Sequence, residues 1–361
     1  MPLPIAIDYR PALLSRAGIG RSVRELCRAL SRCADLDVHL FGHSLARAKV
    51  PVEVPDAARL HRLPIAGRAL PTLAKLGLGM DRLAGRARVV HWTDYVQPPV
   101  SRARTVLTVH DLAFARDPSW HGTQAAELLQ RTKAAIARAD AIVTPSRTTA
   151  DDLRRFVPEA KPAHVIPFGA DHVPRQRFAD PLAGRPFALC VGTIEPRKNH
   201  LTLLAAWRAL PAPRPLLVVA GAVGWACDDA VTALEQAARE GDVRWLRAAD
   251  DATLWALLQH ARLCVYPSLW EGFGFPPLEA MALGVPVVAH DEAPMRELGG
   301  GAIALCDARD AEALAATIQR ALGDDAHRHH LIAAGRARAA TFTWRACAEQ
   351  HAQLYREVGA C

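Results

Sequence analysis

The sequence predicts an α/β protein with two doubly wound parallel sheets, and three observations lead to this prediction. Short apolar runs alternate with longer stretches of helical period along most of the 361 residues, which is the pattern of strand–helix units in parallel sheets. The runs are nearly continuous in Val, Ile and Leu, as in strands buried on both faces. The length exceeds what a single hydrophobic core usually holds, so we expect two domains.

The predicted elements form two series, separated by a linker. Strands are expected at 3–8, 37–42, 88–92, 104–109, 140–144 and 163–167, and then at 187–193, 216–221, 242–246, 262–267 and 285–289; helices are expected at 20–32, 123–139, 199–209, 229–240, 252–261 and 310–322. Residues 168–186 are rich in Pro, Gly and charge without an apolar period, as in a linker. We therefore expect domains at 1–172 and 173–341, followed by a terminal helix within 342–361.

Composition excludes several classes of protein. Half of the residues are hydrophobic and the net charge is only +7, which excludes a disordered chain. No uncharged apolar run is long enough to span a bilayer, and the first ten residues lack the pattern of a secretory signal. The eight cysteines form no C-x-x-C pair, which favours reduced thiols. We expect a cytoplasmic protein.

The positive charge is concentrated in the first half of the chain. Residues 1–180 carry 27 basic and 17 acidic side chains, whereas residues 181–361 carry 17 and 20. Residues 59–88 hold seven basic side chains and one acid, with leucines between them. This segment suits an anionic membrane surface or a lipid-linked ligand, although a solvated loop and helix explains it as well. No array of aromatic residues accompanies the charge, so we expect no nucleic-acid partner.

Two motifs of the first half follow strands. Gly18-Ile19-Gly20 precedes the helix at 20–32 and resembles the start of a dinucleotide fingerprint, but Val23 takes the third glycine position and the loop is too long. The glycines still permit close backbone approach and the helix start offers N–H groups to an anion; a plain flexible loop is the alternative. His110 ends the strand at 104–109, where it can contact a ligand or move a proton. His91 is a similar candidate.

The segment Glu195-Pro196-Arg197-Lys198-Asn199 lies between a strand and a helix. Two adjacent cations before a helix N-terminus suit a diphosphate. The chain uses arginine far more often than lysine, and Lys198 is the only lysine in the sequence of residues 181–361. A solvated basic turn is the alternative, and we favour the phosphate interpretation.

The most specific motif is EGFGFPPLE at 271–279, after the strand at 262–267. Its glycines free backbone N–H groups for a ligand, and its prolines suit a helix start. Glu271 and Glu279 are too far apart along a helix to form the close carboxylate pair of a retaining glycosidase. We expect them to bind different parts of one long ligand.

No metal site is predicted. Asp35-Leu36-Asp37 lies at the amino end of a strand, away from the ligand edge expected for open α/β sheets. The histidines at 327, 329 and 330 lack the partner spacing of a zinc site.

With these residues in hand, nearly the whole chain resembles family 4 of the retaining glycosyltransferases, which have the GT-B fold of two Rossmann-like domains facing across a cleft. The glycine loop, the His110-Asp111 pair, GTIEPRKN at 192–199 and EGFGFPPLE resemble motifs of that family. The tail at 342–358 resembles the C-terminal helix that crosses back to the N-terminal domain.

The resemblance also implies roles for single residues. Glu279 would hold the nucleotide ribose, and Glu271 would contact the donor sugar. Arg197 and Lys198 would neutralise the leaving diphosphate, and His110 would lie beside the transferred sugar. The remaining donor-binding residues implied are Gly18, Gly20, Phe273, Gly274 and Phe275.

The resemblance implies an enzyme with no cofactor and no metal, whose substrate is a nucleotide diphosphate sugar. We expect a retaining transfer of a hexose, with mannose from GDP-mannose as the favoured donor, to a glycan or lipid-linked glycan in bacterial surface polysaccharide synthesis. The chain would then be a cytoplasmic enzyme peripheral to the membrane. A UDP- or TDP-sugar transferase or a synthase on a soluble acceptor is the alternative enzyme. A non-catalytic nucleotide-binding module is the alternative of a different class.

Overall fold

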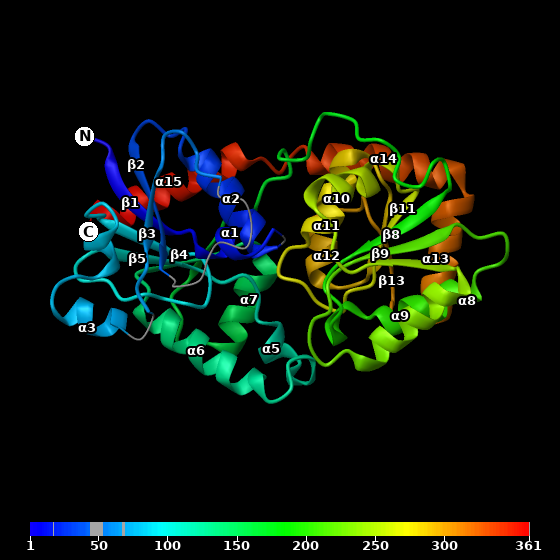
Figure 1. Ribbon diagram of the computed structural model, residues 1–361, viewed down its shortest axis with the longest axis horizontal. Coiled ribbons are helices and arrows are strands. Elements are labelled where there is room, and N and C mark those ends of the chain that lie inside the picture. The colour runs from blue at the N-terminus through cyan, green and yellow to red at the C-terminus, as the bar shows by residue number, and fades with distance from the viewer. Residues whose placement is uncertain (17, 44–52, 67–68, 361) are drawn as a thin grey trace. The chain divides into compact units, whose positions relative to one another are not determined.

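The computed structural model describes residues 1–16, 18–43, 53–66 and 69–360, which divide into two compact units (Figure 1). Unit 1 comprises Met1–Leu112, Ala126–Gly169 and Phe342–Cys361, and unit 2 comprises Ala113–Ala125 and Ala170–Thr341. Each unit is built around one parallel sheet, as the alternation of apolar runs and helical stretches predicts.

The sheet of unit 1 has the strand order β3-β2-β1-β4-β5-β6-β7, and its pairings are parallel. Its strands are β1 (Leu3–Asp8), β2 (Leu36–His43), β3 (Arg59–Leu63), β4 (Val89–Trp92), β5 (Arg104–Thr108), β6 (Ala141–Thr144) and β7 (Ala163–Val165). The helices of this unit are α1 (Arg10–Leu14), α2 (Ile19–Leu30), α3 (Leu70–Lys75), α4 (Met80–Leu83), α7 (Arg147–Phe156) and α15 (Trp344–Ala360), with most of α6 (Gln124–Arg138).

The sheet of unit 2 has the order β10-β9-β8-β11-β12-β13 and is also parallel. Its strands are β8 (Phe187–Val191), β9 (Leu216–Ala220), β10 (Val243–Leu246), β11 (Leu263–Tyr266), β12 (Val287–His290) and β13 (Ala304–Cys306). Its helical segments are α5 (Ala113–Arg116), η2 (Pro118–Trp120), η3 (Pro196–Lys198), α8 (His200–Ala209), α9 (Asp228–Glu240), α10 (Asp251–His260), α11 (Phe275–Leu283), α12 (Ala293–Gly299), α13 (Ala311–Gly323) and α14 (Asp325–Ala339).

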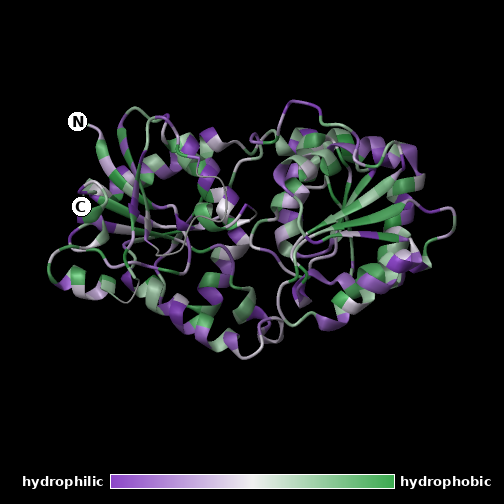
Figure 2. Cartoon of the chain, viewed as in Figure 1, coloured by the Kyte–Doolittle hydropathy of each residue, from purple (hydrophilic) through white to green (hydrophobic). Residues whose placement is uncertain are grey.

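The cores lie where the strands meet the inner helix faces. Figure 2 shows apolar strands and helices with polar outer faces. In unit 2 the largest buried side chain of the core is Trp207 of α8, which packs with residues of β8, β9 and β11. Burial of apolar surface on both faces of a sheet is the main force that holds such a layered fold together.

The strand order fixes where a ligand site is expected. In unit 1, β1 lies between β2 and β4, and in unit 2, β8 lies between β9 and β11. In each sheet the chain therefore builds one half outward from this first strand and then crosses to build the other half. In doubly wound sheets ligands bind beyond the carboxyl ends of the strands at this point. The loops after β1 and β4 in unit 1, and after β8 and β11 in unit 2, are therefore the places to examine.

The C-terminal helix belongs to unit 1, as the resemblance implies. Helix α15 packs against α2, β1, β4 and β5. The buried Tyr355 hydroxyl lies 2.7 Å from His91 Nδ1, and His91 Nε2 lies 2.7 Å from Thr108 Oγ1. Gly169 has Trp344 so close that a Cβ there would lie 2.3 Å from the Trp344 nitrogen. The helix is thus an integral part of the first core.

The structure differs from the predicted division at one internal segment. Residues 113–125 fall in unit 2, although we predicted an uninterrupted first domain at 1–172. The physical reason is aromatic packing. Trp120 clusters with Trp270, the Arg116 guanidinium lies 3.3 Å from the centre of the Trp270 ring, and Trp225 donates its Nε1–H to the Trp120 carbonyl at 2.8 Å. The main crossing comes at Gly169–Ala170, near the start of the predicted linker.

The basic segment 59–88 is not one amphipathic element. It contains the edge strand β3, which sequence reasoning did not predict, and the short helices α3 and α4. Leu76 and Leu78 are exposed. The exposed Arg82, Arg86 and Arg88 line a cavity together with Arg102 and Arg104, at the amino ends of β4 and β5. Arg68 lies outside the described residues.

None of the described helices has both the length and the apolar character needed to cross a bilayer.

The contact between His91 and Tyr355 yields a stability prediction. Tyr355→Phe removes the hydroxyl group and leaves His91 Nδ1 without this hydrogen bond in a buried site. We expect the free energy of unfolding to fall by about 1–3 kcal/mol, measured by urea denaturation. Gln350→Ala, on the exposed side of α15, is the control and should change it by less than about 0.5 kcal/mol. Equal values for the two variants would contradict the assigned contact.

Candidate functional site

The candidate site of unit 2 is formed by the loops that follow β8 and β11. The first loop carries Glu195, Arg197 and Lys198 and includes η3; the second runs from Pro267 to Gly274. The backbone ties the loops together, since Leu269 donates its N–H to the Arg197 carbonyl at 2.8 Å. The Arg197 guanidinium also donates to the Trp270 carbonyl. Both motifs therefore meet at the point where the strand order reverses.

Arg197, Lys198 and Glu271 are in direct contact. Arg197 Nη1 lies 2.9 Å from Glu271 Oε1, and Lys198 Nζ donates to the same oxygen. Arg197 Nη2 also donates to Glu195 Oε1 at 2.7 Å. All four side chains are largely buried. We call these four residues the ion cluster; its two cations and two carboxylates balance in charge.

Two further groups, one on β11 and one in the loop after it, support the ion cluster. Lys198 Nζ donates to the Tyr266 hydroxyl at 3.0 Å, and Ser268 Oγ donates to Glu271 Oε1. Burial raises the pKa of Tyr266 well above its usual value, and the neighbouring Glu271 adds to this. Sequence reasoning assigned no role to Tyr266 or Ser268, although Tyr266 lies at the carboxyl end of the strand predicted at 262–267 and Ser268 directly follows that strand.

The electrostatics of the ion cluster keep Glu271 charged. Burial alone would raise the pKa of its carboxyl, but Arg197 and Lys198, with hydrogen bonds from Lys198 and Ser268, lower it to about 2. For Glu195 burial prevails over Arg197 and Lys198, and the pKa is raised. Glu271 is therefore a carboxylate of the ion cluster that is ionised at neutral pH.

The glycine-rich segment begins helix α11. Gly274 is the N-cap and has a φ of +102°, and a Cβ there would lie 2.6 Å from the Met295 Cε. The backbone conformation therefore requires glycine, and a Cβ would also displace the end of the Met295 side chain. The rings of Phe273 and Phe275 meet edge to face with their centres 5.5 Å apart. These donor-binding candidates form a rigid entry to the helix.

Glu279 is not part of the ion cluster. It lies on α11 and is 1% exposed, and His172 Nε2 lies 2.9 Å from its Oε1. The His172 ring packs edge to face against Trp255 and Phe275. His172 lies in the segment that joins the units, and no pattern in the sequence pointed to it.

The two candidate glycines of unit 1 are required for different reasons, Gly18 by its φ of +52° and Gly20 by its packing. Gly18 is the N-cap of α2, and a Cβ added to it would meet no atom within 4 Å. A Cβ on Gly20 would lie 2.1 Å from the Ser15 carbonyl oxygen and 2.8 Å from that of Pro11. The need for glycine at position 20 is thus explained by close packing of this chain against itself.

His110 follows β5 and is held by the backbone. Its Nε2 lies 2.8 Å from the Thr93 carbonyl, which can only accept, so Nε2 carries the proton and Nδ1 keeps its lone pair. Burial lowers the pKa of His110, so the ring is neutral at pH 7. His91 is different: it is fully buried, with both ring nitrogens occupied by Tyr355 and Thr108, so it is a core residue.

A polar group that sequence reasoning missed follows β1 and β4 in unit 1. Arg10 donates to both carboxylate oxygens of Asp94, at 2.6 and 2.7 Å, and contacts Asp8 at 3.4 Å. Burial raises the pKa of Asp8 to about 7, against the opposing effect of Arg10. Asp8 ends the strand predicted at 3–8 and Arg10 lies two residues after it, so the strand-end rule could have found them.

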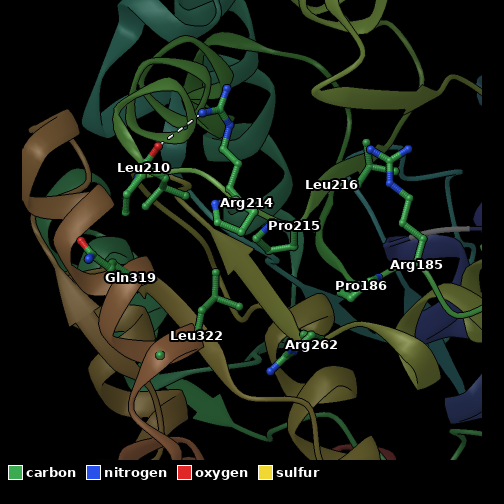
Figure 3. Close-up of a pocket in the computed structure, with 12 residues that line it drawn as sticks. Arg185, Pro186, Leu210, Arg214, Pro215, Leu216, Arg262, Gln319 and Leu322 are labelled. Carbon is green, nitrogen blue, oxygen red and sulfur yellow. Dashed lines mark hydrogen bonds between the residues drawn. The ribbon is translucent and has the colours of Figure 1, made fainter.

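One cavity of unit 2 lies away from the ion cluster, and the described residues offer no metal site. Among the residues that the structure describes, no group of three His, Cys, Asp or Glu side chains could hold a metal ion. A cavity of about 510 Å³ lies at the amino ends of β8, β9 and β11, where Arg185, Arg214 and Arg262 surround apolar walls (Figure 3). This cavity is at the amino ends of the strands, whereas the ion cluster is at their carboxyl ends.

Comparisons with known proteins agree with this fold. The family model described as "Glycosyl transferases group 1" matches residues 173–338, and "Glycosyltransferase Family 4" matches residues 16–173. The O-antigen chain mannosyltransferase B of Escherichia coli is 33% identical over 70% of each chain. The alpha-maltose-1-phosphate synthase of Mycolicibacterium smegmatis is 30% identical over 98% of each. The sucrose-phosphate synthase structure from Thermosynechococcus elongatus superposes with a TM-score of 0.78 at 25% identity, covering 99% of both chains.

The lowered pKa of Glu271 predicts a pH dependence of stability. A carboxyl whose pKa falls from 4.5 to about 2 on folding contributes stability that is full above pH 4.5 and is lost as the pH falls toward 2. The contribution is on the order of 3 kcal/mol. We expect Glu271→Gln to lower the free energy of unfolding at pH 7, and the difference from the unchanged protein to shrink at pH 3, measured by urea denaturation. A difference that does not change with pH would contradict the ion pairs.

Proposed function

The chain is a glycosyltransferase of the GT-B fold and belongs to the family of glycosyl transferases group 1, and on that premise we propose the reaction that it catalyses. We propose a retaining, metal-independent transfer of a hexose from a nucleotide diphosphate sugar to a glycan or lipid-linked glycan. The favoured donor is GDP-mannose, and the favoured role is bacterial surface polysaccharide synthesis. The observation that carries this proposal is the ion cluster at the β8/β11 reversal, with two buried cations on one carboxylate.

Departure of the nucleoside diphosphate is the step that this geometry supports. Negative charge grows on the diphosphate as the bond to the sugar breaks, and fixed cations in a buried site stabilise that charge. Arg197 and Lys198 are held in place by Glu195, Glu271 and Tyr266. An incoming diphosphate competes with Glu271 for these cations, which frees the Glu271 carboxylate to accept hydrogen bonds from donor sugar hydroxyls.

The remaining roles follow the family pattern. Glu279 would accept the ribose hydroxyls, and the N–H groups of Phe273 and Gly274, with Phe275 beside them, would bind the donor. Neutral His110 would contact the transferred sugar, and Gly18 and Gly20 would approach the phosphates. The acceptor hydroxyl would attack on the face that the diphosphate leaves. Two cations at the diphosphate supply the charge that a metal supplies in other enzymes.

The donor sugar and acceptor are inferred from relatives. The mannosyltransferase relative acts, by its name, on an O-antigen chain, which favours mannose and a surface glycan. The second candidate is a UDP- or TDP-sugar enzyme that acts on a soluble acceptor. The maltose-1-phosphate and sucrose-phosphate synthases, which match almost the whole chain, favour it.

A nucleotide panel tests the site. We expect GDP or UDP to bind, and Lys198→Ala to weaken that binding by about 10- to 100-fold, because a charge-assisted hydrogen bond is lost. Isothermal titration calorimetry gives the dissociation constants. Glu271→Ala should reduce sugar transfer more than nucleotide binding. Lys161→Ala, in unit 1, is the control for loss of a lysine.

Two results would count against the proposed site. The first is an unchanged nucleotide affinity in Lys198→Ala. The second is activity that EDTA abolishes and Mg²⁺ restores, which would overturn metal independence.

Membrane association through residues 59–88 is also a proposal. Exposed Arg59, Arg62, Arg82 and Arg86 would attract anionic lipid, each by about 1 kcal/mol. Reversal of these four charges should abolish sedimentation with vesicles that contain phosphatidylglycerol, and high salt should do the same. Undiminished sedimentation of the reversed variant would reject the proposal.

A further inference from the structure

A second cavity lies beside the ion cluster in unit 2. It has a volume of about 380 Å³ and lies at the N-terminal ends of α8 and α9, which follow β8 and β9. Its polar walls are Glu195, Asn199, His200, Asp228 and Asp229, and Leu201 and Ala226 are among its apolar ones. Glu195 and Asn199 belong to the proposed diphosphate segment, but the other polar residues have no place in the proposed reaction.

His200 is a buried polar group with unmet hydrogen bonds. The residue is 2% exposed, and neither ring nitrogen has a hydrogen-bond partner. Burial, helped by the charge of Lys198, lowers the pKa of His200 to about 4, so the ring is neutral. A neutral imidazole offers one donor and one acceptor. Buried polar atoms in folded proteins are nearly always paired, so the unmet hydrogen bonds of His200 favour a ligand in the cavity that this residue lines.

The carboxylates of the cavity determine what charge the ligand can have. Asp228 and Asp229 are exposed in the first turn of α9, and their side chains make no hydrogen bond or ion pair with another described residue. Glu195 adds a third carboxyl, which is paired with Arg197. Two free carboxylates repel phosphate and carboxylate ligands, but they accept hydrogen bonds from hydroxyl groups.

Exposed apolar side chains lie near the N-terminal ends of α8 and α9. Of the large hydrophobic side chains that are exposed in the described chain, Leu201 lines the cavity from the first turn of α8. Val223 and Trp225 are exposed in the loop before α9, whose Ala226 and Cys227 line the cavity. Trp225 is 42% exposed; its indole Nε1–H donates to the Trp120 carbonyl, and the centre of the His121 ring is 5.4 Å from that of its own ring. The loop is fixed, since Gly224 donates its N–H to the Ile194 carbonyl at 2.9 Å.

The cavity lining holds two unpaired carboxylates and a neutral imidazole, and the exposed Trp225 directly precedes Ala226 of that lining in the chain. This combination suits a neutral sugar. The apolar face of a pyranose ring can stack on an indole, and its hydroxyl groups can donate to Asp228 and Asp229 and exchange hydrogen bonds with His200. We propose that this cavity is a second carbohydrate-binding site that holds one neutral hexose ring of the glycan that the enzyme extends. The identity of that glycan rests on the proposed function; the existence of a sugar site does not.

Direct sugar binding tests this proposal. The probes are methyl α-D-mannopyranoside and methyl α-D-glucopyranoside, observed by saturation-transfer NMR on the full chain. We expect at least one of them to bind, and Trp225→Ala and the double variant Asp228→Asn/Asp229→Asn each to weaken binding about tenfold, equivalent to about 1.4 kcal/mol. Trp225→Phe keeps an aromatic face and should retain most of the affinity. Leu76→Ala, an exposed apolar residue of unit 1, is the matched control.

Four results would overturn the proposal. They are no binding of either glycoside, equal binding by all variants, tighter binding of mannose 1-phosphate than of the methyl glycosides, and binding that requires Ca²⁺. GDP and UDP affinities measured on the same variants separate this site from the proposed reaction. Loss of sugar binding with unchanged nucleotide affinity supports a second site. Failure of the nucleotide panel while sugar binding persists would count against the proposed reaction alone.

Discussion

The ion cluster is the interaction on which the account of unit 2 depends. Buried charges are costly unless they are paired, and here Arg197 and Lys198 share the Glu271 carboxylate while Arg197 also holds Glu195. The same contacts join the loops that follow β8 and β11. One set of ion pairs therefore holds these loops together at the carboxyl ends of the strands and positions two cations for a diphosphate. The pairing also keeps the cations in position when no ligand is present. A diphosphate then has only to take the place of the Glu271 carboxylate as the partner of Arg197 and Lys198.

Much of this arrangement could be predicted from the sequence. The alternation of apolar runs and helical stretches gave the parallel sheets, and the rule that ligands bind at the carboxyl ends of strands selected Arg197, Lys198 and Glu271. The sequence could not predict that Lys198 and Glu271 share one contact, because that depends on the placement of two loops far apart along the chain. Only the adjacency of β8 and β11 brings them together.

Other parts depend on tertiary contacts that leave no local pattern. Residues 113–125 pack with unit 2 because Trp120 contacts Trp270 and Trp225. No hydrophobic period or sequence motif predicts such a contact. His172 pairs with Glu279 from within a segment that reads as a plain linker. The edge strands β3 and β13 were missed, since β3 is rich in arginine and β13 is only three residues long; edge strands need less apolar character than central ones.

The most direct test of the central claim is a crystal structure of the protein with GDP or UDP bound. The account predicts that Lys198 Nζ and the Arg197 guanidinium contact oxygens of the diphosphate, and that the contact between Lys198 and Glu271 is broken or shared with the ligand. A nucleotide bound elsewhere on the chain, with Lys198 and Arg197 still paired only with Glu271 and Glu195, would contradict it.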